Sequence, residues 1–189
     1  MTLYLHDDEY ISNYIRKHRC WEPITTEILL ELIKMESSTD SIFVDIGANI
    51  GYFSLIVAEQ GVPVVAFEPV AANFRLLTRS IYQNNFSDLI TAYMVPLSDK
   101  REMIQLNVCN KNMGLCSTRK LLPEDHSYVQ SSMSECLDKY FGRGTRNNLI
   151  VKIDVEEQEL KVLRGMVETL ASGKISYIIL EISNYEEEI

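Results

Sequence analysis

The stretch SIFVDIGANIGY, from Ser41 to Tyr52, decides the fold of this chain. Its apolar run reaches Asp45, and Gly47, Asn49 and Gly51 then precede a second apolar run. This order predicts a buried strand, a tight glycine turn and a helix start. In an open α/β sheet such a turn lies at the carboxyl end of a strand, where ligands bind.

Two later apolar runs also end on acidic residues. The run 62–67 is followed by Glu68, and the run 149–153 is followed by Asp154, with Glu156 two residues further on. Because the carboxyl ends of parallel strands meet at one edge of a sheet, these carboxylates are expected along a single rim. A rim of negative groups would attract a positively charged ligand.

The remaining segments alternate strand and helix patterns, the order typical of a parallel sheet with crossover helices. Residues 100–148 interrupt this order and are interpreted as an insertion over the site, with strands at 103–108 and 128–133. The other expected strands are 42–46, 62–67, 90–96, 149–153 and 175–182. The expected helices are 8–19, 25–35 capped by Thr25 or Thr26, 52–60, one from Pro69 to Asn84, 135–141, and one with Leu160, Leu163, Val167 and Leu170 on one apolar side.

The length of 189 residues is sufficient for one domain with a proper core. We therefore expect a single domain over 1–189. Its parts would be N-terminal helices at 1–40, a cofactor-binding half at 41–99, the insertion at 100–148 and an acceptor-side half at 149–189.

Charge and composition restrict the partners. The net charge is −9, which disfavours a nucleic acid or an anionic membrane surface. No apolar run reaches the roughly 18 residues that a membrane span needs. The N-terminus is charged where a signal peptide has its apolar core. The four cysteines form no CxxC pair, so reduced thiols and a cytoplasmic location are expected.

The glycine pattern favours one ligand over another. A dinucleotide prefers GxGxxG at a helix N-terminus, and the third glycine is missing here. S-adenosylmethionine (SAM) carries no phosphate, and its cationic sulfonium and ammonium suit a site with Asp45 and Asp154. Glu68 can accept hydrogen bonds from both ribose hydroxyls. Because such an acid would suit NAD equally, an NAD-dependent oxidoreductase stays as an alternative.

Four segments, in this order and spacing, resemble the FkbM family of SAM-dependent methyltransferases: VDIGANIGYFSL (44–55), AFEPVAANFRLL (66–77), PLSD (96–99) and VKIDVEEQELKVLRG (151–165). The resemblance implies a Rossmann-like class I methyltransferase fold, a mostly parallel α/β sheet with helices on both faces. It also implies methylation of a hydroxyl on a small molecule or glycan. By this resemblance, Asp45, Gly47, Asn49 and Gly51 would line the methionine portion of SAM. Glu68, with Pro69 beside it, would bind the ribose, and Ser98 and Asp99 would bind the adenine edge. Asp154 and Glu156 would face the methyl group and the acceptor.

Two departures from the family pattern have consequences. Glu157 stands where the family usually has glycine, which supports the alternative of a catalytically impaired SAM-binding or partner protein. The class I fold usually finishes with an antiparallel hairpin, and the chain stops near Ile189, so this hairpin is expected to be missing. The sheet would then have an uncovered edge, through which an oligomer could form.

The chemistry needs a group that removes the proton of the acceptor hydroxyl. Asp154 or Glu156 could act as general base, and His126 in the insertion is a further candidate. The same carboxylates could hold a divalent metal, but no third ligand has a telling spacing, so no metal site is expected. Lys152, inside an apolar strand, is expected to form an ion pair, with Glu181 as the candidate partner.

Overall fold

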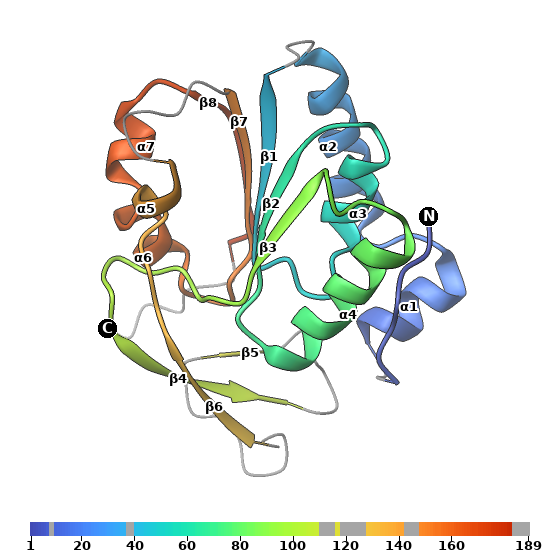
Figure 1. Ribbon diagram of the computed structural model, residues 1–189, viewed down its shortest axis with the longest axis horizontal. Coiled ribbons are helices and arrows are strands. Elements are labelled where there is room, and N and C mark those ends of the chain that lie inside the picture. Colours follow the sequence, from blue (N-terminus) through green and yellow to red (C-terminus); the bar gives the residue numbers. More distant parts are fainter. Residues whose placement is uncertain (8–9, 37–39, 110–115, 118–127, 142–147, 183–189) are drawn as a thin grey trace.

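The computed structural model describes residues 1–7, 10–36, 40–109, 116–117, 128–141 and 148–182. Figure 1 shows a main sheet with helices on both sides and a smaller sheet below it. His126, the further candidate for the general base, lies outside the described residues.

The main sheet has five strands, all paired in parallel, in the order β3-β2-β1-β7-β8. This is the α/β order expected for the class I methyltransferase fold. Several strands are shorter at one end than the sequence predicts. Their bounds are β1 Ser41–Ile46, β2 Val64–Phe67, β3 Ile90–Tyr93, β7 Asn148–Ile153 and β8 Ile175–Leu180.

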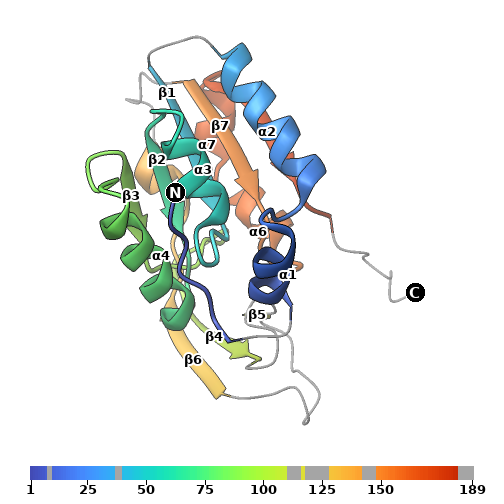
Figure 2. The same cartoon turned by 90° about the vertical axis from the view of Figure 1, so that its right-hand side faces the viewer.

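Helices cover both faces of this sheet, and α1 to α4 lie in front of it in Figure 2. The front helices are α1 Ile11–His18, α2 Pro23–Met35, α3 Tyr52–Ala58 and α4 Ala71–Gln83. The opposite side carries α5 Asp138–Phe141, α6 Glu159–Arg164 and α7 Val167–Ala171.

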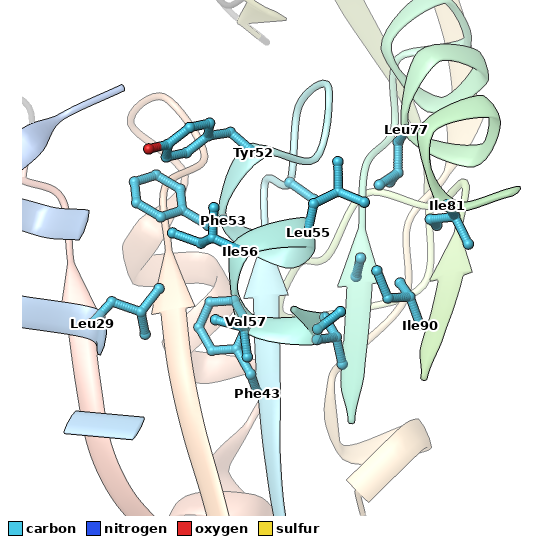
Figure 3. Packing of buried hydrophobic residues seen from close by; sticks show 14 of the residues in the cluster. Leu29, Phe43, Tyr52, Phe53, Leu55, Ile56, Val57, Leu77, Ile81 and Ile90 are labelled. Atoms are coloured by element: carbon cyan, nitrogen blue, oxygen red, sulfur yellow. The ribbon is translucent and has the colours of Figure 1, made fainter. Parts of the chain in front are cut away.

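The core has two layers because side chains alternate along the strands. In β1, Phe43 packs into the layer beneath α2, α3 and α4, whereas Val44 and Ile46 pack into the opposite layer. Figure 3 shows the first layer, where Leu29 of α2 and Leu77 of α4 converge with α3 on the sheet. With both faces covered, β1 is buried almost throughout, as its apolar sequence indicates.

Helix α2 begins two residues earlier than expected and without a threonine cap. Pro23 occupies the first turn, and Glu22 before it has φ 40°, in the left-handed region. Thr26 does not cap the helix with its side chain; its hydroxyl donates to the Trp21 carbonyl at 2.7 Å. Proline, with its fixed φ and no N–H, suits this first turn.

The prediction of one long helix after β7, with Leu160, Val167 and Leu170 on its buried side, is wrong in two respects. The chain forms two short helices, α6 and α7, separated at Gly165 and Met166. Leu160 and Val167, expected on the buried side, are 54% and 58% exposed, while Met166 is fully buried. The break falls where the chain passes close to Ser98, and a Cβ on Gly165 would lie 1.9 Å from the Ser98 carbonyl oxygen. The break changes the face that α7 presents, and Leu170 is exposed as well.

The insertion forms the two expected strands, β4 Met103–Val108 and β6 Tyr128–Met133, which pair antiparallel along their full length. A two-residue strand, β5 Cys116–Ser117, pairs with the other edge of β4. The expected helix over 135–141 is limited to α5. None of the helices in the described part of the chain has the length and apolarity needed to cross a bilayer.

Candidate functional site

A pocket of about 250 Å³ lies at the carboxyl ends of the main strands. Its floor comes from the segments that follow β1, β2, β3, β7 and β8. Two walls come from elsewhere: Ile104 and Leu106 of β4, and Tyr10, Trp21 and Glu22 of the N-terminal helical segment. The pocket therefore collects residues from both ends of the described chain.

The structure brings seven of the ten predicted site residues to this pocket and leaves three outside its lining. The seven are Gly47, Asn49, Glu68, Pro69, Ser98, Asp154 and Glu156. Asp45, Gly51 and Asp99 are not part of the lining.

The glycine turn after β1 is required by close packing. A Cβ on Gly47, which has φ +85°, would lie 1.8 Å from the carbonyl oxygen of Asp154. The N–H groups of Gly47 and Ala48 both donate to the Phe67 carbonyl at 2.9 Å, which ties the turn to β2. Gly51 instead begins α3 and packs against Leu77. The two glycines thus serve the pocket floor and the helix start respectively.

Glu68 is a buried carboxylate on the pocket wall, 4% exposed. It accepts hydrogen bonds from the N–H groups of Asn49 and Val70, each at 2.8 Å, and from the Asn73 amide at 3.3 Å. Burial raises the pKa of Glu68 to about 7, against the lowering effect of these donors. A carboxylate has about four acceptor positions, so three donors fix its orientation and leave capacity for a ligand hydroxyl.

Asp45 lies in the core beside the pocket floor and is 1% exposed. Its Oδ2 accepts a hydrogen bond from the Ser54 hydroxyl at 2.6 Å, while its Oδ1 has no hydrogen-bond partner among the described residues. Burial raises the pKa of Asp45, and the charge of Lys152 opposes that rise. Asp45 is paired in register with Lys152 on the neighbouring strand β7. Any effect of Asp45 on a ligand would therefore act through Lys152 or the turn.

Lys152 is a buried ammonium, 3% exposed, that forms an ion pair with Asp154 Oδ2 at 2.7 Å. Its Nζ also lies 4.8 Å from the centre of the Phe53 ring. Burial lowers the pKa of Lys152, but the carboxylates of Asp154 and Asp45 outweigh it, so that pKa lies above its ordinary value. The ion-pair partner is Asp154, rather than Glu181 as the sequence suggested.

Two further carboxylates approach Asp154. Oxygens of Glu22, Asp154 and Glu181 lie within 4.8 Å of one another. The charge of Asp154, with partial burial, raises the pKa of Glu181 to about 7. The sequence offered no spacing that would unite these acids, because Glu22 comes from the turn before α2 and Glu181 follows β8. Three clustered carboxylates could bind a cation, either organic or metallic.

Glu156 and Glu157 both have positive φ, 50° and 71°. The N–H of Glu157 donates to Glu159 Oε1 at 3.1 Å, which holds this turn in place. Burial, followed by the charge of Asp154, raises the pKa of Glu156 to about 7. Glu157, where the resemblance to the FkbM family implies glycine, therefore adopts a left-handed conformation that glycine favours.

Ser98 lines the pocket, and its N–H donates to the Glu135 carbonyl at 2.9 Å. Asp99, expected beside it, lies outside the lining. Sequence patterns missed several lining residues because they come from distant segments or from the far side of a turn. These residues are Tyr10, Glu22, Asn73 and Lys161, whereas Ile104 and Leu106 belong to the insertion that was expected over the site.

The parallel strand order, the glycine turn after β1 and the acidic residues after β2 and β7 together define a class I methyltransferase fold. The sequence matches the family model for the methyltransferase FkbM domain over residues 45–189. The chain therefore belongs to the FkbM methyltransferase family.

The proteins similar to the chain include two curated proteins and a solved FkbM methyltransferase structure. It is 28% identical to the hexuronic acid methyltransferase AglP of Haloferax volcanii over 156 residues, 82% of this chain and 61% of that protein. It is 26% identical to the AMB antimetabolite synthetase AmbE of Pseudomonas aeruginosa, covering 76% of this chain and 8% of that protein. The FkbM methyltransferase structure from Methylobacillus flagellatus matches at 20% identity with a TM-score of 0.49, covering 75% of this chain and 34% of that one.

Proposed function

We propose that this protein is a SAM-dependent methyltransferase that methylates a hydroxyl group on a small molecule or glycan. The observation that carries this proposal is the oriented Glu68 carboxylate at the end of β2, in the same pocket as Asp154 and Glu156 at the end of β7. Membership of the FkbM methyltransferase family supports it, as does the similarity to the hexuronic acid methyltransferase of Haloferax volcanii.

The pocket fits SAM by the chemistry of its acceptor groups. Glu68 is positioned to accept hydrogen bonds from the ribose hydroxyls, and Gly47 keeps the floor free of side-chain atoms. Asp154 and Glu156 at the other end suit the cationic methionine portion, and Lys152 balances the charge of Asp154. SAM supplies an electrophilic methyl carbon when bound, so the protein has to position the acceptor and remove its proton.

Glu156 is the better candidate for the general base. Its pKa of about 7 leaves a large fraction deprotonated at neutral pH while keeping enough basicity to take a proton. Asp154 has one carboxylate oxygen occupied by the Lys152 ammonium at 2.7 Å. We assign Asp154 to fixing the negative charge of the site and Glu156 to proton removal.

A second candidate is a SAM-binding protein without turnover. The observation that favours it is the left-handed φ of 71° at Glu157, where the resemblance to the FkbM family implies glycine. This backbone strain falls directly beside Glu156. An NAD-dependent oxidoreductase finds no such support, since the chain belongs to a methyltransferase family.

Calorimetry with S-adenosylhomocysteine (SAH), SAM and NAD tests the cofactor assignment. We expect SAH and SAM to bind and NAD to give no heat of binding. Mass spectrometry of SAH formed from SAM with hydroxylated acceptors then separates an enzyme from an inactive binding protein. Binding of NAD in place of SAH would overturn the proposal.

A further inference from the structure

The N-terminal segment supplies a wall of the pocket. Tyr10, Trp21 and Glu22 all line it, although the family match begins only at residue 45. The turn between α1 and α2 holds this wall in place, because the Thr26 hydroxyl donates to the Trp21 carbonyl at 2.7 Å. The Tyr14 ring meets the Trp21 ring edge-on, with centroids 5.5 Å apart. The wall is thus a built part of the pocket.

This wall brings a carboxylate to the end of the pocket that already carries Asp154. Glu22 completes the group with Asp154 and Glu181, whose oxygens lie within 4.8 Å of one another. The ammonium of Lys152 lies 2.7 Å from Asp154 Oδ2 and balances one of the three negative charges. The group therefore keeps a net negative charge when all three acids are ionised. A carboxylate on an acceptor would meet repulsion here, whereas an ammonium would be attracted.

The aromatic rings of the wall favour the same kind of ligand. A cation held beside Trp or Tyr gains from the electron-rich face of the ring, and this gain adds to the attraction of nearby acids. Trp21 is next to Glu22 in sequence, and Tyr10 lines the same pocket. Aromatic rings together with carboxylates suit an organic ammonium better than a bare metal ion, which prefers an all-oxygen shell.

We propose that the Trp21–Glu22 wall is a specificity-determining part of the acceptor subsite, and that it selects an acceptor with a protonated amine close to the methylated hydroxyl. An amino sugar or an amino alcohol has this chemistry. The inference rests on the proposed methyltransferase function and names its acceptor class. It sets this chain apart from the hexuronic acid methyltransferase of Haloferax volcanii, because a hexuronic acid carries a carboxylate.

The chain offers a direct probe, because Trp21 is its single tryptophan. Tryptophan fluorescence of the full chain is measured at pH 7, with and without saturating SAH, while glucosamine, N-acetylglucosamine or glucuronate is added. Glucosamine and N-acetylglucosamine share a ring and differ in charge at the nitrogen. We expect glucosamine to bind at least about tenfold more tightly than N-acetylglucosamine, which corresponds to about 1.4 kcal/mol. Glucuronate should bind weakest.

A pair of glutamate variants tests the role of the wall. Glu22→Gln should lower glucosamine affinity about tenfold and leave N-acetylglucosamine affinity unchanged. The matched control is Glu31→Gln, because Glu31 is an exposed residue of α2 paired with Lys34 and lies outside the pocket. This control should change neither affinity. Titration with Mg²⁺ alone shows whether the acids bind a metal instead.

Equal affinity for the charged and neutral sugars, or a preference for glucuronate, would overturn the inference. So would a Glu22→Gln variant with unchanged glucosamine affinity. Mg²⁺ binding that is lost in this variant, with glucosamine affinity unchanged, would assign the acids to a metal instead. SAH affinity, measured separately by calorimetry, distinguishes these outcomes from failure of the proposed function. If SAH binds and glucosamine does not, the acceptor class is wrong. If SAH does not bind, the proposed function itself is wrong.

Discussion

Glu68 combines burial, a fixed orientation and a place on the pocket wall. Three donors from two separate segments hold its carboxylate, so its position is set before any ligand arrives. We expect Glu68→Ala to reduce SAH affinity at least about a hundredfold, because the ribose hydroxyls lose their charged acceptor. Calorimetry measures this, with circular dichroism to confirm the fold. Asp99→Ala, outside the lining, should bind SAH like the unmodified protein.

Retained affinity in the Glu68 variant would contradict the ribose assignment. Reduced affinity in the Asp99 variant would return that residue to the adenine edge, where the sequence first suggested it.

The assignment of Glu156 as general base predicts a specific pH dependence of turnover. A general base must be deprotonated, so activity should rise with pH through about 7, the pKa of Glu156. Glu156→Gln should lower kcat by roughly 10²–10⁴ and leave SAH affinity nearly unchanged. Steady-state rates from pH 5 to 9 give both results. A Glu156→Gln enzyme with normal kcat, or a pH profile without this limb, would exclude the residue as the base.

The turn between β7 and α6 is strained by two consecutive non-glycine residues with positive φ. Glu157→Gly should raise the free energy of unfolding by about 0.5–1 kcal/mol, because a left-handed conformation costs about 1–2 kcal/mol for residues with a Cβ and glycine loses part of this gain through its flexible unfolded state. Urea unfolding measures the change. Glu157→Ala keeps the Cβ and provides the control, since it should give no such gain.

If Glu157→Gly also restores or increases turnover, strain beside Glu156 limits activity. A loss of stability in the glycine variant would mean that the Glu157 carboxylate contributes more than the strain removes.

The elements that the sequence predicted well are those with strong local signals. The strands carry short apolar runs, and the turn after β1 has glycine where close packing excludes a side chain, as at Gly47. The helices after β7 were predicted less well, because a regular leucine stripe continues across Gly165 and hides the break. At that break Gly165 packs against Ser98, a residue 67 positions earlier in the chain, and no local pattern records this contact.

The candidate site was predictable where a residue follows a strand and unpredictable where it comes from elsewhere. Glu68, Asp154 and Glu156 reach the pocket because parallel strands end at one edge. Asp45 also ends an apolar run, yet its side chain is buried against Ser54, because a strand alternates its side chains and the last one need not face the ligand. Glu22 reaches the pocket only through the packing of α1 and α2, which follows from tertiary contacts.

At the scale of the whole molecule, ligand binding should stabilise the fold. A ligand at 100 times its Kd adds about 2.7 kcal/mol to the free energy of unfolding. For a chain of this size, 1 kcal/mol shifts Tm by about 2–4 °C, so SAH should raise Tm by about 5–10 °C. Differential scanning fluorimetry or calorimetry measures the shift. NAD at the same concentration should leave Tm unchanged, and an equal shift with NAD would contradict the cofactor assignment.

Three predictions about the whole chain stay predictions. The single-domain organisation over 1–189 is consistent with a core in which α2 packs on the same layer as α3 and α4. Within the described residues β8 pairs only with β7, so it forms an edge of the main sheet, and association of copies along this edge stays a prediction. The cytoplasmic location likewise stays a prediction.

The N-terminal wall of the pocket has a consequence for how this architecture can diversify. The groups assigned to SAM follow the strands of the main sheet, whereas Trp21 and Glu22 belong to a short turn that precedes all of those strands. Exchange of a few residues in that turn would leave the sheet and its glycine floor intact. New acceptor preferences could then arise by local substitution, with the donor half left as it is.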